Sequence, residues 1–140
     1  AQEYYNEKFE SANEFLLGAK FYHNQNIYKK SAFLLHQACE NLFYAIRLVY
    51  TLQNAKTHNL ARLLDSVKKC SDEFIRVFPQ NSAEEKRLFN LIKAAYVDGR
   101  DNPDFQVTSE DIDALMPKVE SLRDITERIC IERSVSYVEN

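Results

Sequence analysis

Apolar residues recur at helical spacing throughout the stretch 27–53, which contains neither Gly nor Pro. Its main apolar stripe is formed by Leu35, Ala38, Leu42, Ile46 and Val49. Further apolar residues lie on either side of this stripe, so the predicted helix has little surface suited to water. We therefore expect it at the centre of a helical bundle, or between a bundle and a partner subunit.

The polar residues of the same stretch fall mostly on one ridge. They follow one another at steps of three, four or seven positions and therefore share a helix face: Lys29, His36, Glu40, Tyr44 and Arg47. An apolar helix with one ionisable ridge is the feature on which we base any function.

The rest of the chain predicts further helices and no strands. A first helix is expected over 4–23, and a third over about 58–77 with Thr57 as its N-cap. Because the break at 24–26 is short and polar, the first two helices should be antiparallel neighbours.

Two hydroxyl residues mark the start of the later helices. Ser82 and Glu85 form a capping-box pattern at the start of a fourth helix, and Thr108 is expected to cap a last helix that ends near residue 131. Pro117 requires a kink in this last helix or a later start. Gly99 and Pro103 predict a bent or looped segment over 98–107.

These elements predict an all-α fold, an antiparallel up-down bundle of about five helices in a single domain over residues 1–140. The first residue is Ala and not Met. We therefore expect the domain to be a piece of a longer chain.

Charge and cysteine content narrow the class of protein. A formal net charge of −3 and a pI near 5.7 argue against general nucleic-acid binding, since proteins that grip many phosphates are usually basic. Cys39, Cys70 and Cys130 are widely spaced and form no CxxC pair, which favours reduced thiols and a cytoplasmic location. The sequence has no secretory signal, and no apolar run reaches the ~18 residues of a membrane span.

Three segments in order resemble a known family: SAFLLHQACENLFYAIRLVY, KTHNLARLLD and FNLIKAAYVDGRDNPDF. They are similar to the HEPN domain, a small helical bundle found beside minimal nucleotidyltransferases and in RNA-cutting toxins. The likeness is strongest to a bacterial branch in which the HEPN domain follows a nucleotidyltransferase domain in one chain. It implies a homodimer packed across the long central helices, with a polar groove for a nucleotide-like ligand.

The resemblance also carries residues into that groove. His36 and Glu40 on the central helix, His58 at the start of the next, and Tyr96 with Arg100 match positions that line it in the family. Relatives usually have Tyr after the Arg of the Tyr-x-x-x-Arg motif, where this chain has Asp101, so the ring of Phe105 is a candidate for that stacking role.

The ribonuclease members of the family carry Arg, about four to six residues and then His, which works in acid–base catalysis. Counted from Arg100, the corresponding positions hold Phe105, Gln106 and Val107, and no His follows His58 anywhere in the chain. We therefore expect no ribonuclease activity in this chain. We also expect no metal, because spacing supplies only two ligands, His36 and Glu40, and we expect no cofactor. Any catalysis is expected in a separate nucleotidyltransferase domain, in cis or in trans.

The candidate ligands each have a structural alternative. Lys93, Tyr96 and Arg100 share one helix face and suit an anionic aromatic ligand, or else Arg100 pairs with a nearby Asp and Tyr96 fills the core. His36 and Glu40 either face a groove or satisfy each other inside the bundle or the dimer interface. His58 either binds ligand or caps a helix.

Three functions remain open at this stage. The first is a non-catalytic HEPN module that binds a nucleotide or similar anion and dimerises. The second is a purely structural dimerisation or protein-interaction module, and the third is a divergent ribonuclease. The sequence does not name the ligand, the substrate of a partner nucleotidyltransferase, the oligomeric state or membership of a toxin–antitoxin pair.

Overall fold

The computed structural model describes residues 2–51, 53, 56–97 and 101–139. Its elements in chain order are α1 (Gln2–Asn24), α2 (Tyr28–Thr51), α3 (Leu60–Lys68), the 3₁₀ helix η1 (Asp72–Arg76), α4 (Ala83–Ala94) and α6 (Ser109–Glu139). The described residues contain no strand. The predicted all-α helical bundle is confirmed.

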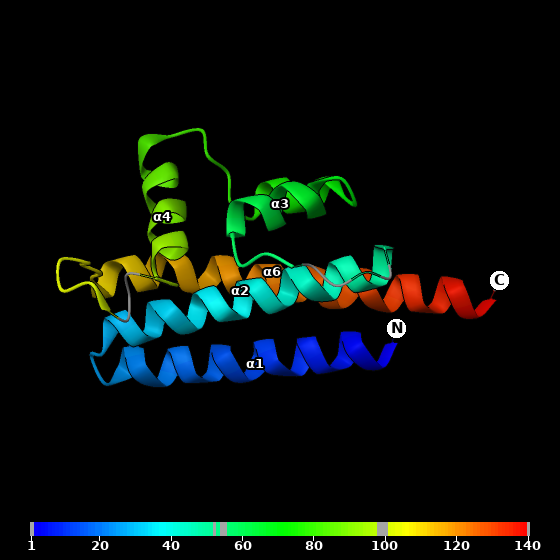
Figure 1. Ribbon diagram of the computed structural model, residues 1–140, viewed down its shortest axis with the longest axis horizontal. Coiled ribbons are helices and arrows are strands. Elements are labelled where there is room, and N and C mark those ends of the chain that lie inside the picture. The colour runs from blue at the N-terminus through cyan, green and yellow to red at the C-terminus, as the bar shows by residue number, and fades with distance from the viewer. Residues whose placement is uncertain (1, 52, 54–55, 98–100, 140) are drawn as a thin grey trace.

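The three long helices lie side by side along the long axis of the molecule (Figure 1). α1 runs antiparallel to both α2 and α6, whereas α2 and α6 run in the same direction. α3 and α4 lie on one side of α2, with α4 standing across the long axis. The bundle therefore alternates in direction between α1 and its neighbours, while the shorter helices return the chain from the end of α2 to the start of α6.

A tight connection joins α1 to α2. Asn26 adopts a left-handed backbone conformation with φ of 62°, which Asn tolerates better than most residues. Its side chain accepts a hydrogen bond from the Tyr28 hydroxyl at 2.9 Å. Within the packed pair, the buried Ser31 hydroxyl donates to the Ala19 carbonyl at 2.8 Å, so the predicted antiparallel neighbours are in direct contact.

α2 is the buried centre of the bundle. Of its 24 residues, 14 are buried, and it contacts α1, α3, α4 and α6. The predicted stripe is confirmed, because Leu35, Ala38, Leu42 and Ile46 are fully buried and Val49 is nearly so. A helix surrounded in this way also places some of its polar side chains inside the protein.

The predicted third helix, over 58–77 with Thr57 as its N-cap, is wrong in its bounds. The N-cap is Asn59, whose side-chain oxygen accepts from the Arg62 amide at 3.2 Å. The helix ends at Lys68, and Ser71 then takes an extended conformation and caps η1. Ser and Asn compete with the helix for backbone hydrogen bonds, which explains both boundaries.

The predicted caps of the later helices are confirmed. Ser82 and Glu85 form a reciprocal capping box at the start of α4. Thr108 and Asp111 exchange side-chain and backbone hydrogen bonds at 3.0 and 3.1 Å at the start of α6. α6 then continues through Pro117 and past the predicted end near residue 131.

No helix in the described part of the chain is both long enough and apolar enough to cross a membrane.

The central position of α2 predicts a large difference between two leucine substitutions. Leu42→Ala should lower the free energy of unfolding by about 2–5 kcal/mol, because it leaves a cavity at a fully buried position. Leu17→Ala is the matched control and should change it by about 0.5 kcal/mol or less, because Leu17 is 71% exposed on α1. Urea unfolding followed by circular dichroism measures both. Equal losses would contradict the assignment of α2 as the core helix.

Candidate functional site

The ionisable ridge of α2 meets the segment that leads into α3. Glu40 is 2% exposed, and its carboxylate contacts Nδ1 of His58 in a short ion-pair geometry. The Tyr44 hydroxyl lies 2.8 Å from the same carboxylate oxygen and 2.8 Å from the Thr57 carbonyl. Glu40, Tyr44 and His58 thus tie the central helix to the start of α3.

Burial and hydrogen bonding keep Tyr44 in its neutral form. The pKa of its hydroxyl is raised well above the usual range, first by burial and then by its hydrogen bond to Glu40. Tyr44 therefore remains a hydrogen-bond donor throughout the physiological pH range.

Aromatic rings from two segments, α2 and the segment before α3, stack around Tyr96. Its ring centroid lies 5.0 Å from that of His36, with an interplanar angle of 21°, and 5.1 Å from that of His58, with an angle of 13°. The Phe33 ring is also nearly parallel to it, at 6.5 Å and 16°. Tyr96 therefore joins the end of α4 to α2 and to the segment before α3.

His36 is a buried, neutral imidazole. It is 1% exposed, and Gln37 Nε2 lies 3.3 Å from its Nδ1. Burial, followed by the charge of His58, lowers the pKa of His36 to about 4, although a hydrogen bond to the His58 backbone opposes this shift. His36 is thus uncharged near neutral pH and serves as a ring to stack on.

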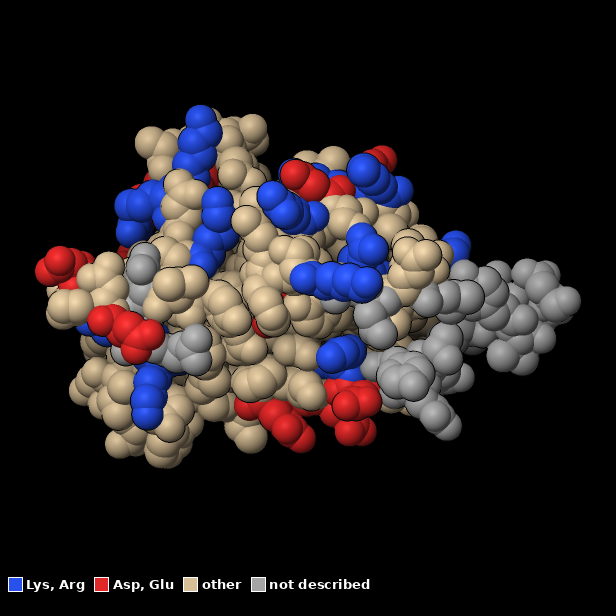
Figure 2. Space-filling model, viewed as in Figure 1, with Lys and Arg blue, Asp and Glu red and all other residues tan. Residues whose placement is uncertain are grey.

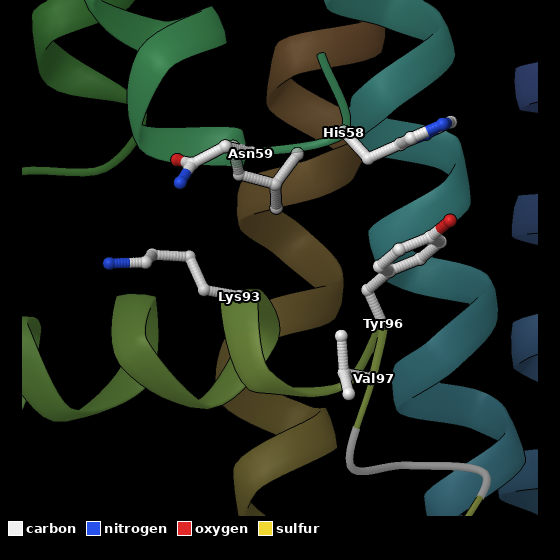
Figure 3. Close-up of a pocket in the computed structure, with 6 residues that line it drawn as sticks. His58, Asn59, Lys93, Tyr96 and Val97 are labelled. Carbon is white, nitrogen blue, oxygen red and sulfur yellow. The ribbon is translucent and has the colours of Figure 1, made fainter.

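A groove of about 250 Å³ opens beside this stack. It lies between the start of α3 and the end of α4, and its lining residues are His58, Asn59, Leu60, Lys93, Tyr96 and Val97. Figure 3 shows the rings of His58 and Tyr96 one above the other, while the Lys93 ammonium points to the opposite side. His58 is the open part of the stack, because its side chain is 61% exposed.

Positive charge predominates in the segment that forms the groove. The segment 56–97 carries eight Lys and Arg but five Asp and Glu, although the whole chain has a net charge of −3. Figure 2 shows Lys and Arg side chains gathered over α3 and α4, and carboxylates along α1. The N-terminus of α3 adds the positive end of a helix dipole at Asn59 and Leu60. These charges favour an anionic ligand.

The predicted site residues separate into three groups. His58, Lys93 and Tyr96 line the groove together. His36 and Glu40 lie directly behind it as buried partners of Tyr96 and His58. Phe105 is partly buried against the core and is not among the residues that line the groove. Arg100 lies outside the described residues.

Two residues of the site, Tyr44 and Asn59, were not identified from the sequence. Tyr44 lay on the predicted ridge, one turn after Glu40, and this spacing could have identified it as a partner of the carboxylate. Asn59 gave a weaker signal, because a cap residue is not distinguished from its neighbour Thr57 by sequence alone.

A second histidine contact lies at the other end of the bundle. His23 Nε2 is 3.2 Å from both Ser109 Oγ and Asp113 Oδ1, which joins the end of α1 to the start of α6. Within the described part of the chain, no three His, Cys, Asp or Glu side chains converge in a geometry suited to a metal ion.

The buried state of His36 predicts a loss of stability in mild acid. Its pKa in the folded protein is about 4, below the ordinary value of about 6.5, so the unfolded chain takes up the proton first. Stability should therefore fall as the pH drops from about 6.5 to about 4, by up to about 3 kcal/mol from this group.

Urea unfolding at several pH values measures this dependence. His36→Gln should flatten the curve in this range. A His36→Gln curve parallel to that of the wild type would contradict the buried neutral imidazole.

Comparison with known proteins agrees with the architecture. The family model of the HEPN domain matches residues 5–129, which is most of the chain. A search of curated proteins gave no match. With its helical bundle and a family match over nearly its whole length, this chain belongs to the HEPN domain family.

Proposed function

We propose that this chain is a non-catalytic HEPN module that binds a nucleotide, or a similarly anionic aromatic ligand, in the groove between α3 and α4. The observation that carries the proposal is the exposed His58 ring. It is stacked on Tyr96 and lies in a groove bordered by Lys93 and the N-terminus of α3. One border suits phosphate and the other suits a planar ring.

The phosphates are assigned to the positive border. The first turn of α3 has backbone N–H groups without helical acceptors, and such groups bind anions well. The flexible stem of Lys93 allows its ammonium to turn toward bound phosphates. Arg100, which follows Tyr96 by four residues in the sequence, is proposed as a second phosphate ligand on the family resemblance alone.

The planar part of the ligand is assigned to His58. Tyr96 already has His36 and His58 as stacking partners, so a further ring adds most readily to the exposed imidazole. His36 and Glu40 then support this surface from behind. Aromatic and imidazole surfaces of this kind accept nucleobases with little preference for sequence.

The absence of catalysis is proposed from the sequence. The ribonuclease arrangement of Arg, four to six residues and then His is not present after Arg100. We further propose that the module acts as a homodimer together with a nucleotidyltransferase domain, in cis or in trans, and presents substrate to it. Both partnerships rest on the resemblance to the branch in which the two domains share a chain.

Calorimetric titration with ATP, GTP, CTP and UTP tests the ligand. Saturable binding is expected for at least one of them, and Lys93→Ala should weaken it about tenfold or more by removing a charge-assisted contact. Lys86→Ala is the matched control, because it removes the same charge from an exposed position near the other end of α4. Arg100→Ala tests the residue assigned from the family.

Equal affinity in Lys93→Ala and Lys86→Ala would contradict the assignment of the phosphates to this groove. The absence of binding heat for all four nucleotides would contradict the proposal.

The second candidate function is a structural dimerisation module. It is favoured by one observation, that Glu40, Tyr44 and His58 already satisfy one another inside the protein. If this module is the function, sedimentation velocity should give a dimer that nucleotides neither strengthen nor weaken. A monomer at micromolar concentration would contradict dimerisation in both candidate functions.

Cleavage of RNA that is lost in Arg100→Ala would instead support the divergent ribonuclease.

A further inference from the structure

The contact between Glu40 and His58 determines more than the position of the ring. Glu40 is a buried carboxylate, and an ionised carboxylate can only accept hydrogen bonds. The hydroxyl of Tyr44, held neutral, lies within donor distance of the same oxygen that contacts Nδ1 of His58. With a carboxylate on this side of the ring, Nδ1 must be the donor.

A proton on Nδ1 defines the other ring nitrogen. A neutral imidazole carries one N–H, so Nε2 of His58 is left with a lone pair. In Figure 3 the nitrogen-bearing end of the His58 ring points toward α2, the helix that carries Glu40. Throughout the described residues, Nδ1 has partners in Glu40 and Tyr44, and Nε2 has no hydrogen-bond partner.

We propose that Glu40 is a positioning residue that holds His58 in its Nδ1–H tautomer, so that Nε2 is left as a hydrogen-bond acceptor for a ligand that stacks on this exposed ring. The complementary chemical group is a donor, either a hydroxyl or an amino group. The tautomer stands on the contacts of Glu40 alone, whereas its use in ligand recognition rests on the proposed function.

This tautomer fixes the direction in which a nucleotide binds. A lone pair on Nε2 repels a bare phosphate oxygen and attracts a ribose hydroxyl or the amino group of a base. Lys93 lies on the opposite side of the groove from the His58 ring (Figure 3). The nucleoside part is therefore placed at His58, and the phosphates are placed at the Lys93 border.

Long-range ¹H–¹⁵N correlation spectra of the ligand-free, ¹⁵N-labelled protein test the tautomer directly. In the spectrum of the neutral imidazole, recorded at alkaline pH, His58 should show a protonated Nδ1 and a bare Nε2. The spectrum is assigned by its loss in His58→Gln. A bare Nδ1, or protons on both nitrogens, would overturn the proposal without any variant of Glu40.

Two variants separate the carboxylate from the hydroxyl beside it. Glu40→Leu removes the acceptor at similar volume, and the proton should then move to Nε2, since Tyr44 Oη is 3.5 Å from Nδ1 and becomes its nearest donor. Tyr44→Phe keeps the carboxylate and should keep the Nδ1–H tautomer. If a folded Glu40→Leu protein kept the same tautomer, Glu40 would not be the residue that positions the proton on His58. If that variant does not fold, the wild-type spectrum decides.

The same variants test recognition. For a nucleotide that binds the wild type, Glu40→Leu should weaken affinity about tenfold and Tyr44→Phe should change it less than threefold, as expected when one hydrogen bond to the ligand is lost. Equal affinity in wild type and Glu40→Leu would overturn the assigned role in recognition. If no nucleotide binds the wild type, the proposed function fails and the spectrum still decides the tautomer.

Discussion

The burial of α2 on all sides is the constraint on which the rest of the structure depends. A helix in contact with four other helices buries several of its polar side chains, and a buried polar side chain needs a partner inside the protein. His36 and Glu40 are nearly inaccessible, and their partners come from segments far along the chain. The positions of the segment before α3 and of the end of α4 follow from this requirement.

The candidate site lies where these internal contacts reach the protein surface. His58 satisfies the buried carboxylate of Glu40 with one nitrogen and still exposes most of its side chain. Tyr96 covers the buried His36 and is one of the residues that line the groove. The same residues therefore close the core and form the surface of the groove, and a substitution at Glu40 or His36 acts on both.

The sequence predicted the elements that depend on local rules. The apolar period of α2 and the caps at Ser82 and Thr108 depend on neighbours within a few residues, and all three were found correctly. The extent of the third helix was not found, because Ser71 and Asn59 compete with helical backbone bonds in a way that apolar spacing does not reveal. The pairing of Glu40 with His58, 18 residues apart, depends on tertiary packing, so a helical ridge could identify the carboxylate but not its partner.

The distribution of charge makes the molecule electrically polar despite its modest net charge. Positive side chains gather over α3 and α4, the helices that border the groove, and negative ones gather along α1 (Figure 2). If its surface charge were distributed uniformly, a protein with a net charge of −3 would repel an approaching anion from every side. Here the Lys and Arg side chains over α3 and α4 offset that repulsion locally, and within a Debye length of about 8 Å at physiological ionic strength they attract an anion near the groove. The molecule thus presents its groove to anions during encounter, before any contact with the lining residues is made.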